Sequence, residues 1–517
     1  MIDITQIDKN DSNVWSMIGE GRVKGCFQIE SHLGKTWCQQ VKPENIDELA
    51  ALISIIRPGC LKSISDGKSM TQHYVDRKHG HEEVSILHES ITDILDETYG
   101  IIVFQEQAMK IAEKMASFDL KEADNLRKAI GKKNASLMKE MREKFIEGCL
   151  NNNISKDKSE EVFDIIEKSN RYSFNKSHAV AYALMCYWSA FLKYYYPEKF
   201  FKHWLRNADE KIDPDVEKKQ LIMAARSENI EVKGPHLTKL YENFSWEDNA
   251  IYFGICNVKN VGKIHLDKIK KYMLQFDQTP TWSELVFKVL PHVNKRAVEN
   301  LIKVGAFSGY SISRTEMLHH FSCIKTLTTK ELQHLDNLIE QEEKLTQMSP
   351  VEILSYFHSL GVKKDGGLIS SIARSEKVKD IITRIQNPGR SLSDNPSIYA
   401  KLEEQLLGCS INHSELNACS DASYANTTIK EINDGKTDKS TIAGIITNIR
   451  EHKTKNKDMM AFLSCEDFTG ELENIVIFPD VYEQNKDIIY RDATLLLTGE
   501  IKDKKRNSFI IESVFLI

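Results

Sequence analysis

The chain has 517 residues, a length that predicts roughly three or four domains at about 150 residues each. Hydrophobic residues make up 41% and charged residues 28%, the balance of a globular protein, which excludes wholesale disorder. The 69 Lys and Arg residues against 75 Asp and Glu residues give a net charge of −6. A basic footprint over the whole chain is therefore excluded, and any surface for nucleic acid must be local.

No run of about 18 apolar residues occurs, which argues against a membrane-spanning helix. The N-terminal segment is acidic and lacks the apolar region of a signal peptide. The ten cysteines are scattered, without a C-x2-C pair and without a His pair at zinc spacing. We therefore expect a cytoplasmic protein with reduced thiols, no membrane partner and no metal ligands of its own.

Residues 1 to about 235 are predicted to be mostly helical. The segment 45–56 (NIDELAALISII) has apolar residues at helical spacing and ends at the turn Arg57-Pro58-Gly59. A charged helical region is expected over 119–148, with one break near Gly131. A long aromatic helix is expected from Ser177, its predicted N-cap, to Tyr196, because Pro197 stops it.

Short strands are predicted between about 236 and 255, followed by two small helical units at 257–272 and 294–307. Polar helices are expected over 320–400. From Thr441 to Ile517 five alternating segments with intervening glycines predict a small Greek-key barrel of the oligonucleotide-binding (OB) type. The expected fold is therefore multidomain and mainly α, with a C-terminal all-β barrel.

Basic residues gather in the segment 126–133 (LRKAIGKK). Between Lys121 and Lys144 there are eight Lys or Arg residues and four Asp or Glu residues, a local excess of positive charge. Arg offers bidentate contacts to a phosphate and Lys a point charge, so this cluster fits a triphosphate or a nucleic-acid backbone. The alternative is an ordinary solvated helix face.

The polar run Asn175-Lys176-Ser177-His178 stands at the start of the long aromatic helix. Donors at this place lie beside free backbone N–H groups, which together form a ready anion site. His178 is a candidate to transfer a proton or to hold a phosphate or sugar. The alternative is a capping turn with one structural histidine.

The apolar segment 99–104 ends in Gln105-Glu106-Gln107. A buried strand with this ending is a candidate to present Gln105 and Gln107 to a nucleobase or a phosphate. The alternative is a strand-to-helix junction with exposed polar side chains.

Turns with flanking cations open both small helical units. The first holds Lys259, Gly262 and Lys263, and the second holds Lys295 and Arg296. Such turns offer backbone N–H groups and ammonium groups to a DNA phosphate without reading the sequence. The alternative is a pair of ordinary helical hairpins.

Basic residues also follow the first strand of the predicted barrel, among them Lys453, Lys455 and Lys457. Barrels of this type bind single strands with a charged groove and stacking aromatic rings. The alternative is that these lysines only solubilise a hairpin tip.

Several motifs in order resemble the fingers region of the bacterial DNA polymerase III alpha subunit, the C-family replicative polymerase. They are GCFQIES (25–31), IIRPGCL (55–61), HYVDRKHG (73–80), YGIIVFQEQAMKIA (99–112), ADNLRKAIGKKN (123–134) and YSFNKSHAVAYAL (172–184). The resemblance continues through YFGICNVKNVG (252–262) and NLIKVGAF (300–307), which are similar to that family's helix-hairpin-helix domain. EEQLLGCSINHSEL (403–416) and the segment from Thr441 onward resemble the approach to its C-terminal barrel and the barrel itself.

The resemblance implies four domains: fingers over 1–235, a helix-hairpin-helix domain over 236–320, a helical or linker segment over 321–436, and an OB barrel over 437–517. It also implies a site for the incoming dNTP. Arg127 and Lys128 match the basic pair that faces the triphosphate, although Lys128 stands where the family has Arg. The remaining residues implied at this site are Arg57, Lys132, Lys133, Asn175, Lys176, Ser177 and His178.

In that family the three catalytic aspartates lie in a palm domain that precedes the fingers. The resemblance therefore implies no catalytic residue in this chain, and Mg²⁺ held by a partner subunit with the palm and a phosphoesterase-like (PHP) domain. No convincing Gln-x-x-Leu-Phe box for a sliding clamp occurs in 320–400.

Our interpretation is the C-terminal half of a split, phage-like replicative polymerase that binds dNTP and primer–template DNA in the cytoplasm of a bacterium or an infected host. The sliding clamp and a single-stranded DNA-binding protein are further candidate partners. The rival interpretation is a non-catalytic, DNA-binding scaffold of the replisome derived from the same family.

Overall fold

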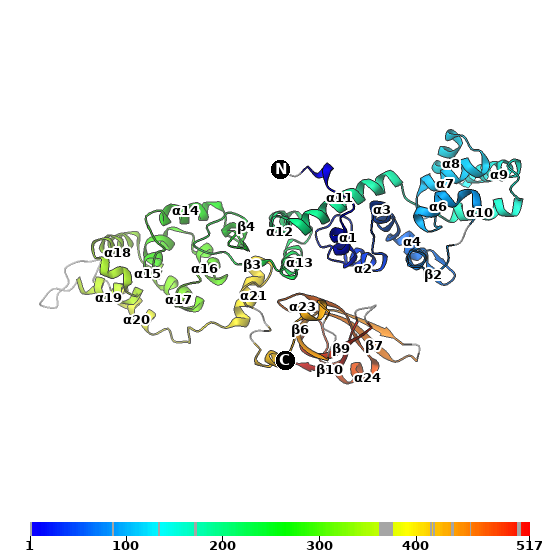
Figure 1. Ribbon diagram of the computed structural model, residues 1–517. Helices are drawn as coiled ribbons and strands as arrows, with labels where there is room; N and C mark the ends of the chain where they lie inside the picture. The colour runs from blue at the N-terminus through cyan, green and yellow to red at the C-terminus, as the bar shows by residue number, and fades with distance from the viewer. Residues whose placement is uncertain are drawn as a thin grey trace. The chain divides into compact units, whose positions relative to one another are not determined.

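The computed structural model describes residues 3–84, 87–132, 135–169, 173–360, 376–413, 416, 419–435, 439–454, 456–503 and 508–517 (Figure 1). The chain divides into two compact units, Met1–Pro197 and Glu198–Ile517. Among the described residues, no helix is long and apolar enough to cross a lipid bilayer.

One core of the first unit is built around two helices that are distant in the sequence, residues 46–55 and residues 176–195. Its elements are α1 (Ser12–Gly19), α2 (His32–Val41), α3 (Ile46–Ile55), α4 (Pro58–Lys62), β1 (Ile64–Ser65), β2 (Lys68–Ser69), α5 (Met70–Lys78) and α11 (Lys176–Tyr195). Leu49, Ala50 and Leu52 of α3 are fully buried with Ala183, Cys186 and Tyr187 of α11 in one apolar cluster. The predicted N-cap Ser177 is wrong by two residues, because the side chain of Asn175 accepts the hydrogen bond from the backbone N–H of His178.

A second core of the same unit is an all-helical bundle. It contains α6 (Thr92–Leu95), α7 (Gln105–Ala116), α8 (Leu120–Lys132), α9 (Ala135–Asn151) and α10 (Lys156–Ser169). Phe145 and Phe163 are fully buried at its centre with Ile111 and Met115. Gly131 and Lys132 are helical, and the predicted break near Gly131 stays a prediction because residues 133 and 134 lie outside the described part of the chain.

The second unit begins with helices and a small sheet, followed by a predominantly helical region. Its first elements are α12 (Pro197–Arg206), α13 (Pro214–Ser227), β3 (Glu231–Lys233), β4 (Ser245–Glu247) and β5 (Ala250–Tyr252). The three strands form a sheet in the order β3-β5-β4, which confirms the short strands expected here. The next elements are η5 (Ile255–Asn257), α14 (Lys263–Met273), α15 (Trp282–Glu284), the π-helical turn η6 (Leu285–Val289), η7 (Leu290–His292), α16 (Lys295–Lys303) and α17 (Arg314–Ile324).

Polar helices follow, as expected: α18 (Thr329–Gln341), η8 (Glu343–Gln347), α19 (Pro350–Leu360), α20 (Glu376–Gln386) and α21 (Pro396–Leu407). Glu403 of α21 is fully buried and links α21 to α17 and to the segment that follows α21. Its carboxylate pairs with Arg314 at 2.8 Å and accepts hydrogen bonds from the backbone N–H groups of Ile411 and Asn412.

The chain then forms a closed five-stranded barrel. Short helical segments, η9 (Ser420–Tyr424) and α23 (Ile429–Asn433), precede it, and its elements are β6 (Ser440–Lys453), β7 (Met459–Glu466), β8 (Glu471–Ile477), α24 (Pro479–Asn485), β9 (Thr494–Asp503) and β10 (Ser508–Leu516). The strand order is β10-β8-β7-β6-β9, with β9 pairing back to β10. The β8–β10 pair is parallel and every other described pair is antiparallel. This closed Greek-key topology confirms the expected mainly α fold with a C-terminal OB-type barrel.

Candidate nucleotide and DNA sites

Two motifs that are about 70 residues apart in the sequence meet as neighbouring backbones. Phe104 and Phe174 form a parallel β-bridge. The backbone N–H of Phe174 donates to the carbonyl of Val103 at 2.9 Å, and the N–H of Gln105 donates to the carbonyl of Phe174 at 2.9 Å. The bridge therefore places the N-terminus of α7 beside the N-terminus of α11.

Glu106 joins these two helix starts. Its carboxylate accepts hydrogen bonds from the side-chain amide of Asn175 and from the backbone N–H of Lys176, each at 2.8 Å. The ammonium of Lys176 pairs with Glu97 at 2.6 Å. Sequence reasoning singled out the two glutamines and missed the glutamate between them, although a carboxylate in the first turn of a helix is itself a signal for contact with N–H groups.

Gln107 is part of the interior and does not face outward. Its side-chain oxygen accepts from the backbone N–H groups of Val103 and Phe104, at 2.9 and 3.0 Å. Its amide nitrogen donates to Thr98 Oγ1 at 2.8 Å and to the carbonyl of Ile94 at 3.1 Å. With 2% of the residue exposed and all four bonds made, Gln107 has no group left for DNA, and we withdraw it from the DNA-contacting set. Gln105 is half-buried at the first position of α7.

Arg57 lies against the same junction. Its guanidinium is 4.1 Å from the centre of the Phe174 ring, and its Nε donates to the carbonyl of Ser54 at 3.0 Å. Burial lowers the pKa of this guanidinium, and the position of the group over an aromatic face partly compensates for the lost water. The structure thus places Arg57 beside Phe174, the residue before the N-cap of α11.

His178 completes this cluster on the exposed side of α11. Its ring is 4.0 Å from the Tyr182 ring and 5.3 Å from the Phe174 ring, centre to centre. Asn175, Ser177 and His178 are exposed, and Lys176 is half-buried. We call Arg57, Glu106 and residues 174–178 the α7–α11 junction.

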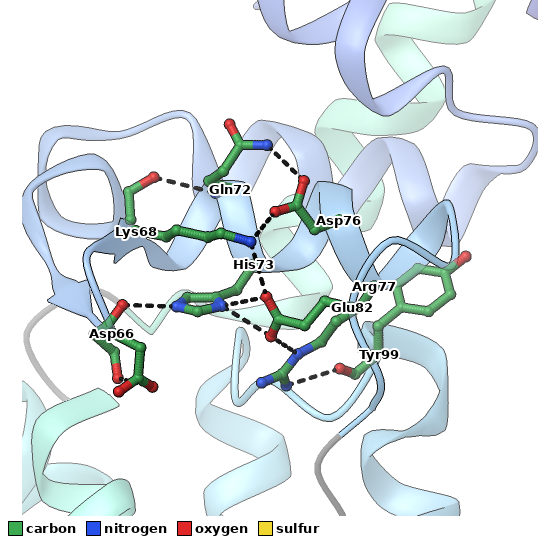
Figure 2. Close-up of polar contacts among 10 residues, drawn as sticks. Asp66, Lys68, Gln72, His73, Asp76, Arg77, Glu82 and Tyr99 are labelled. Atoms are coloured by element: carbon green, nitrogen blue, oxygen red, sulfur yellow. Dashed lines mark hydrogen bonds and ion pairs between the residues drawn. The ribbon is translucent and has the colours of Figure 1, made fainter.

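A network of ion pairs supports the segment that follows Arg57 (Figure 2). Glu82 accepts from Nδ1 of the buried His73 at 2.8 Å and from Nε of Arg77 at 2.8 Å. His73 Nε2 lies 2.9 Å from the carbonyl oxygen of Ser65 in the β1–β2 hairpin. Both ring nitrogens of His73 therefore face oxygen atoms, one of Glu82 and one of Ser65. Burial acts to raise the pKa of Glu82, but the hydrogen bonds from Arg77 and His73 outweigh it and lower that pKa.

The same network reaches the motif that enters α7. Arg77 donates to the carbonyl of Tyr99 at 3.2 Å, as Figure 2 shows. The hydroxyl of Tyr99 donates to Glu48 at 2.7 Å, and Lys78 also binds Glu48. Lys68 pairs with Asp76 at 2.5 Å. These contacts fix α3, α5 and residue 99 relative to one another.

The basic pair of α8 is held by one carboxylate. Arg127 donates to Asp124 through Nε at 3.0 Å and through a terminal nitrogen at 2.8 Å, and Lys128 pairs with Asp124 at 2.7 Å. The hydrogen bonds from Lys128 and Arg127 lower the pKa of Asp124. The side chain of Lys132 and the whole of Lys133 lie outside the described residues.

The cations predicted at the helix-hairpin-helix turns are paired with carboxylates in three of four cases. Lys259 pairs with Asp215 at 2.7 Å, Lys263 with Glu242 at 3.1 Å and Lys295 with Glu299 at 3.7 Å. Arg296 is exposed at the first turn of α16.

Each turn opens a helix. Gly262 is the N-cap of α14, and nothing lies within 4 Å of the position that a Cβ would take there, but its N–H donates to His265 Nδ1 at 3.0 Å. Asn294 caps α16 by accepting from the N–H groups of Arg296 and Ala297.

Two of the three barrel lysines predicted to contact DNA lie among the described residues. Lys453 ends β6 and Lys457 follows in the turn to β7, and both are exposed. Lys455 lies outside the described residues. On the same strand pair, the guanidinium of Arg450 lies 5.0 Å from the centre of the Phe462 ring.

Among the described residues, no group of three or more His, Cys, Asp and Glu side chains is arranged to hold a metal ion.

A fingers-like helical unit, helix-opening turns with cations and an OB-type barrel are together the parts of a DNA-handling protein. Comparison with known proteins specifies the family. Residues 1–153 match the bacterial DNA polymerase III alpha subunit finger domain, and residues 229–317 match a helix-hairpin-helix motif.

Curated relatives extend the similarity to nearly the whole chain. The DNA polymerase III subunit alpha of Aquifex aeolicus is 30% identical over 99% of this chain, and that of Pseudomonas aeruginosa is 29% identical over 97%. The subunit of Borreliella burgdorferi is 28% identical over 99%. The chain spans 40%, 41% and 42% of the lengths of these three relatives. The chain thus corresponds in sequence, over nearly its whole length, to a C-terminal portion of the bacterial-type DNA polymerase III alpha subunits.

Proposed function

We propose that this chain is the nucleotide- and DNA-binding half of a split replicative DNA polymerase, the C-terminal half of an alpha subunit that works with a palm-bearing partner. The observation that carries the proposal is the α7–α11 junction. Motifs that are far apart in the sequence converge there, and five of the residue positions implied for dNTP binding, Arg57 and residues 175–178, lie within it.

The incoming dNTP is the ligand of this junction in the proposal. The N-terminus of α11 supplies a positive partial charge for the triphosphate, although the N–H groups of Lys176 and His178 are already bonded to Glu106 and Asn175. Arg57, Lys176 and His178 surround that terminus, and Glu106 fixes its direction through Asn175. Arg127 and Lys128 of α8, followed by Lys132 and Lys133, supply further positive charge once the triphosphate competes with Asp124 for the first two.

The partner supplies the catalytic aspartates and, with them, the Mg²⁺ that activates the primer 3′ oxygen and stabilises the leaving pyrophosphate. In this proposal, the present chain binds and orients the dNTP and the primer–template DNA. Its helix-hairpin-helix turns contact the phosphates of the primer–template duplex, and the barrel contacts single-stranded template. The partner in this proposal carries the palm and phosphoesterase-like domains, and the sliding clamp and a single-stranded DNA-binding protein complete a cytoplasmic, phage-type replisome.

The test is co-purification of this chain with the product of a neighbouring gene that encodes a palm-like Asp-x-Asp, followed by primer extension with Mg²⁺. We expect extension by the mixture and by neither protein alone. A folded, stable complex that binds primer–template but never extends it would overturn the proposal.

A variant pair separates nucleotide selection from a purely structural role. In the active mixture, Arg127→Ala combined with His178→Ala is expected to weaken dNTP use by at least about 100-fold, because each lost phosphate contact to a charged group contributes roughly 1.5–3 kcal/mol. The affinity of the complex for primer–template should stay within about twofold. Equal losses in both measurements would favour the scaffold interpretation.

A further inference from the structure

The helix-hairpin-helix region carries a positively charged surface at a place that sequence reasoning did not single out. It consists of Lys268 and Lys271 of α14, His292 at the end of η7 and Lys325 at the C-cap of α17. Tyr272 packs within it. We call these five residues the basic patch.

Its geometry is built by packing between elements. Lys268 and Lys271 are three residues apart on α14 and therefore lie on one side of that helix. The Tyr272 ring stacks on the His292 ring, with centres 4.1 Å apart and planes 8° apart, which joins α14 to η7. The ammonium of Lys325 donates to the carbonyl of Pro291 at 2.6 Å, so it is held one residue away from His292.

The groups of the patch repel one another. Partial burial lowers the pKa of Lys325, and the charge of Lys268 lowers it further. Burial also lowers the pKa of His292, and the charges of Lys325, Lys268 and Lys271 add to this effect. Asp336 acts in the opposite direction on His292, but its carboxylate is 3.0 Å from the ammonium of Lys288. Positive groups that are gathered in this way favour the binding of an anion.

The patch differs from the hairpin turns in its counter-charges. Lys259, Lys263 and Lys295 each have a carboxylate partner, as described above. Within the described ranges, Lys268, Lys271 and Lys325 form no ion pair with a carboxylate. A phosphate can therefore approach the patch without displacing an acidic side chain, which is not true of those three lysines.

We propose that the basic patch binds a backbone phosphate of duplex DNA, as a contact additional to the two hairpin turns. The inference rests on the proposed function. The N-cap of α16, Asn294, lies two residues beyond His292, so one strand of a duplex that reaches this helix start passes close to the patch. A duplex is favoured over a single strand because the Tyr272 ring is covered by His292, with Lys271 5.7 Å from its centre, and offers no open face for a base.

The experiment measures binding of the full chain to a labelled DNA duplex by fluorescence anisotropy over a series of salt concentrations. The triple variant K268Q/K271Q/K325Q is compared with the charge-matched variant K270Q/K330Q/K379Q, whose three lysines are exposed on α14, α18 and α20 of the same unit. Because each phosphate contact contributes about 0.9 to the slope of log K against log salt, we expect the patch variant to flatten that slope by roughly 1 to 3. The control variant should change it by much less.

Three results would overturn the inference. Equal slopes for the two triple variants would show a general effect of net charge. A loss of affinity for a single strand without a loss for the duplex would show that the patch binds single-stranded DNA and not a duplex. Failure of the folded wild-type chain to bind any duplex would remove the DNA-binding part of the proposed function as well, which distinguishes the two failures. As a second measurement, the His292 ring resonances should shift when duplex is added to the wild-type chain and should not shift in the patch variant.

Discussion

The fingers unit and the helix-hairpin-helix region handle polar groups in opposite ways. In the fingers unit, Gln107 makes all its hydrogen bonds internally, Glu106 joins two helix starts, and Asp124 holds both Arg127 and Lys128. In the helix-hairpin-helix region, the basic patch gathers lysines around His292 without carboxylate partners of their own among the described residues. In the two proposals, a triphosphate therefore competes with protein groups, whereas a duplex phosphate meets lysines that no described carboxylate pairs.

The largest expected effect is on the stability of the fingers unit. Gln107→Ala leaves the N–H groups of Val103 and Phe104 without acceptors inside the core. Each unsatisfied buried group costs about 1–3 kcal/mol, so we expect a loss of roughly 2–6 kcal/mol in the free energy of unfolding. Denaturant unfolding followed by fluorescence measures it. Gln105→Ala, two residues earlier, is the matched control and should change stability by less than about 1 kcal/mol; equal effects would contradict the internal role of Gln107.

The second effect tests a neutral polar pair in the second unit. Burial lowers the pKa of His320 to about 4, with a smaller contribution from the neighbouring His319, and Nδ1 of His320 accepts from the indole N–H of Trp282 at 3.2 Å. Because the unfolded chain binds this proton near its ordinary pKa of 6.5, stability is full above about pH 6.5 and falls as the pH decreases toward 4. The loss should reach about 3 kcal/mol by pH 4.

The measurement is the pH dependence of unfolding for the wild-type chain and for His320→Gln. The variant should be less stable at pH 7, because it loses the acceptor for Trp282, and its stability should fall less steeply between pH 6.5 and 4. Parallel curves for the two proteins would contradict a titration at His320.

The third effect concerns the α7–α11 junction. Glu106→Ala removes the acceptor of Asn175 and of the Lys176 N–H group, so the start of α11 loses its fixed direction. We expect dNTP use by the reconstituted polymerase to weaken about tenfold, which corresponds to about 1.4 kcal/mol. Glu106→Gln keeps one acceptor oxygen and should recover part of the loss. A fall in duplex affinity of the same size would place Glu106 outside nucleotide binding.

The smallest effect is an expected gain. Asp124→Asn removes the negative charge that holds Arg127 and Lys128. Exposed ion pairs contribute little because water and salt screen them, so the affinity for a dNTP should rise by only about a fewfold. Isothermal calorimetry with a nonhydrolysable dNTP measures it, with Asp119→Asn on the same helix start as the control. A weaker affinity would show that Asp124 orients the pair for the ligand and does not compete with it.

Much of the fold was open to prediction because its signals are local. The end of α3 just before Arg57-Pro58 and the alternating barrel strands each have a signal in a few neighbouring residues, and the structure confirms them. Ser177 and Asn175 are both good N-cap residues by type, so the sequence alone does not distinguish them. The geometry shows that Asn175 accepts the hydrogen bond from the His178 N–H.

The candidate site was less predictable because its decisive contacts are between distant segments. The pairing of Phe104 with Phe174 and the carboxylate of Glu106 across α7 and α11 have no local pattern. The predicted DNA contact of Gln107 was wrong for the same reason. Nothing in its own segment shows that its amide nitrogen donates to Thr98 and to the carbonyl of Ile94. The basic patch joins three elements, and on α14 alone its lysines look like any solvated helix face.

The packing of α11 on α3 also sets how the molecule can be divided. During translation the N-terminal part of the chain emerges from the ribosome first. The residues of α3 are therefore made long before Ala183, Cys186 and Tyr187, which cover α3 in the folded protein. A fragment that stops at residue 153, where the finger-domain match ends, would leave Leu49, Ala50 and Leu52 without that cover. Such a fragment is expected to aggregate, and one that ends at Pro197 is the shortest natural choice for expressing this unit alone.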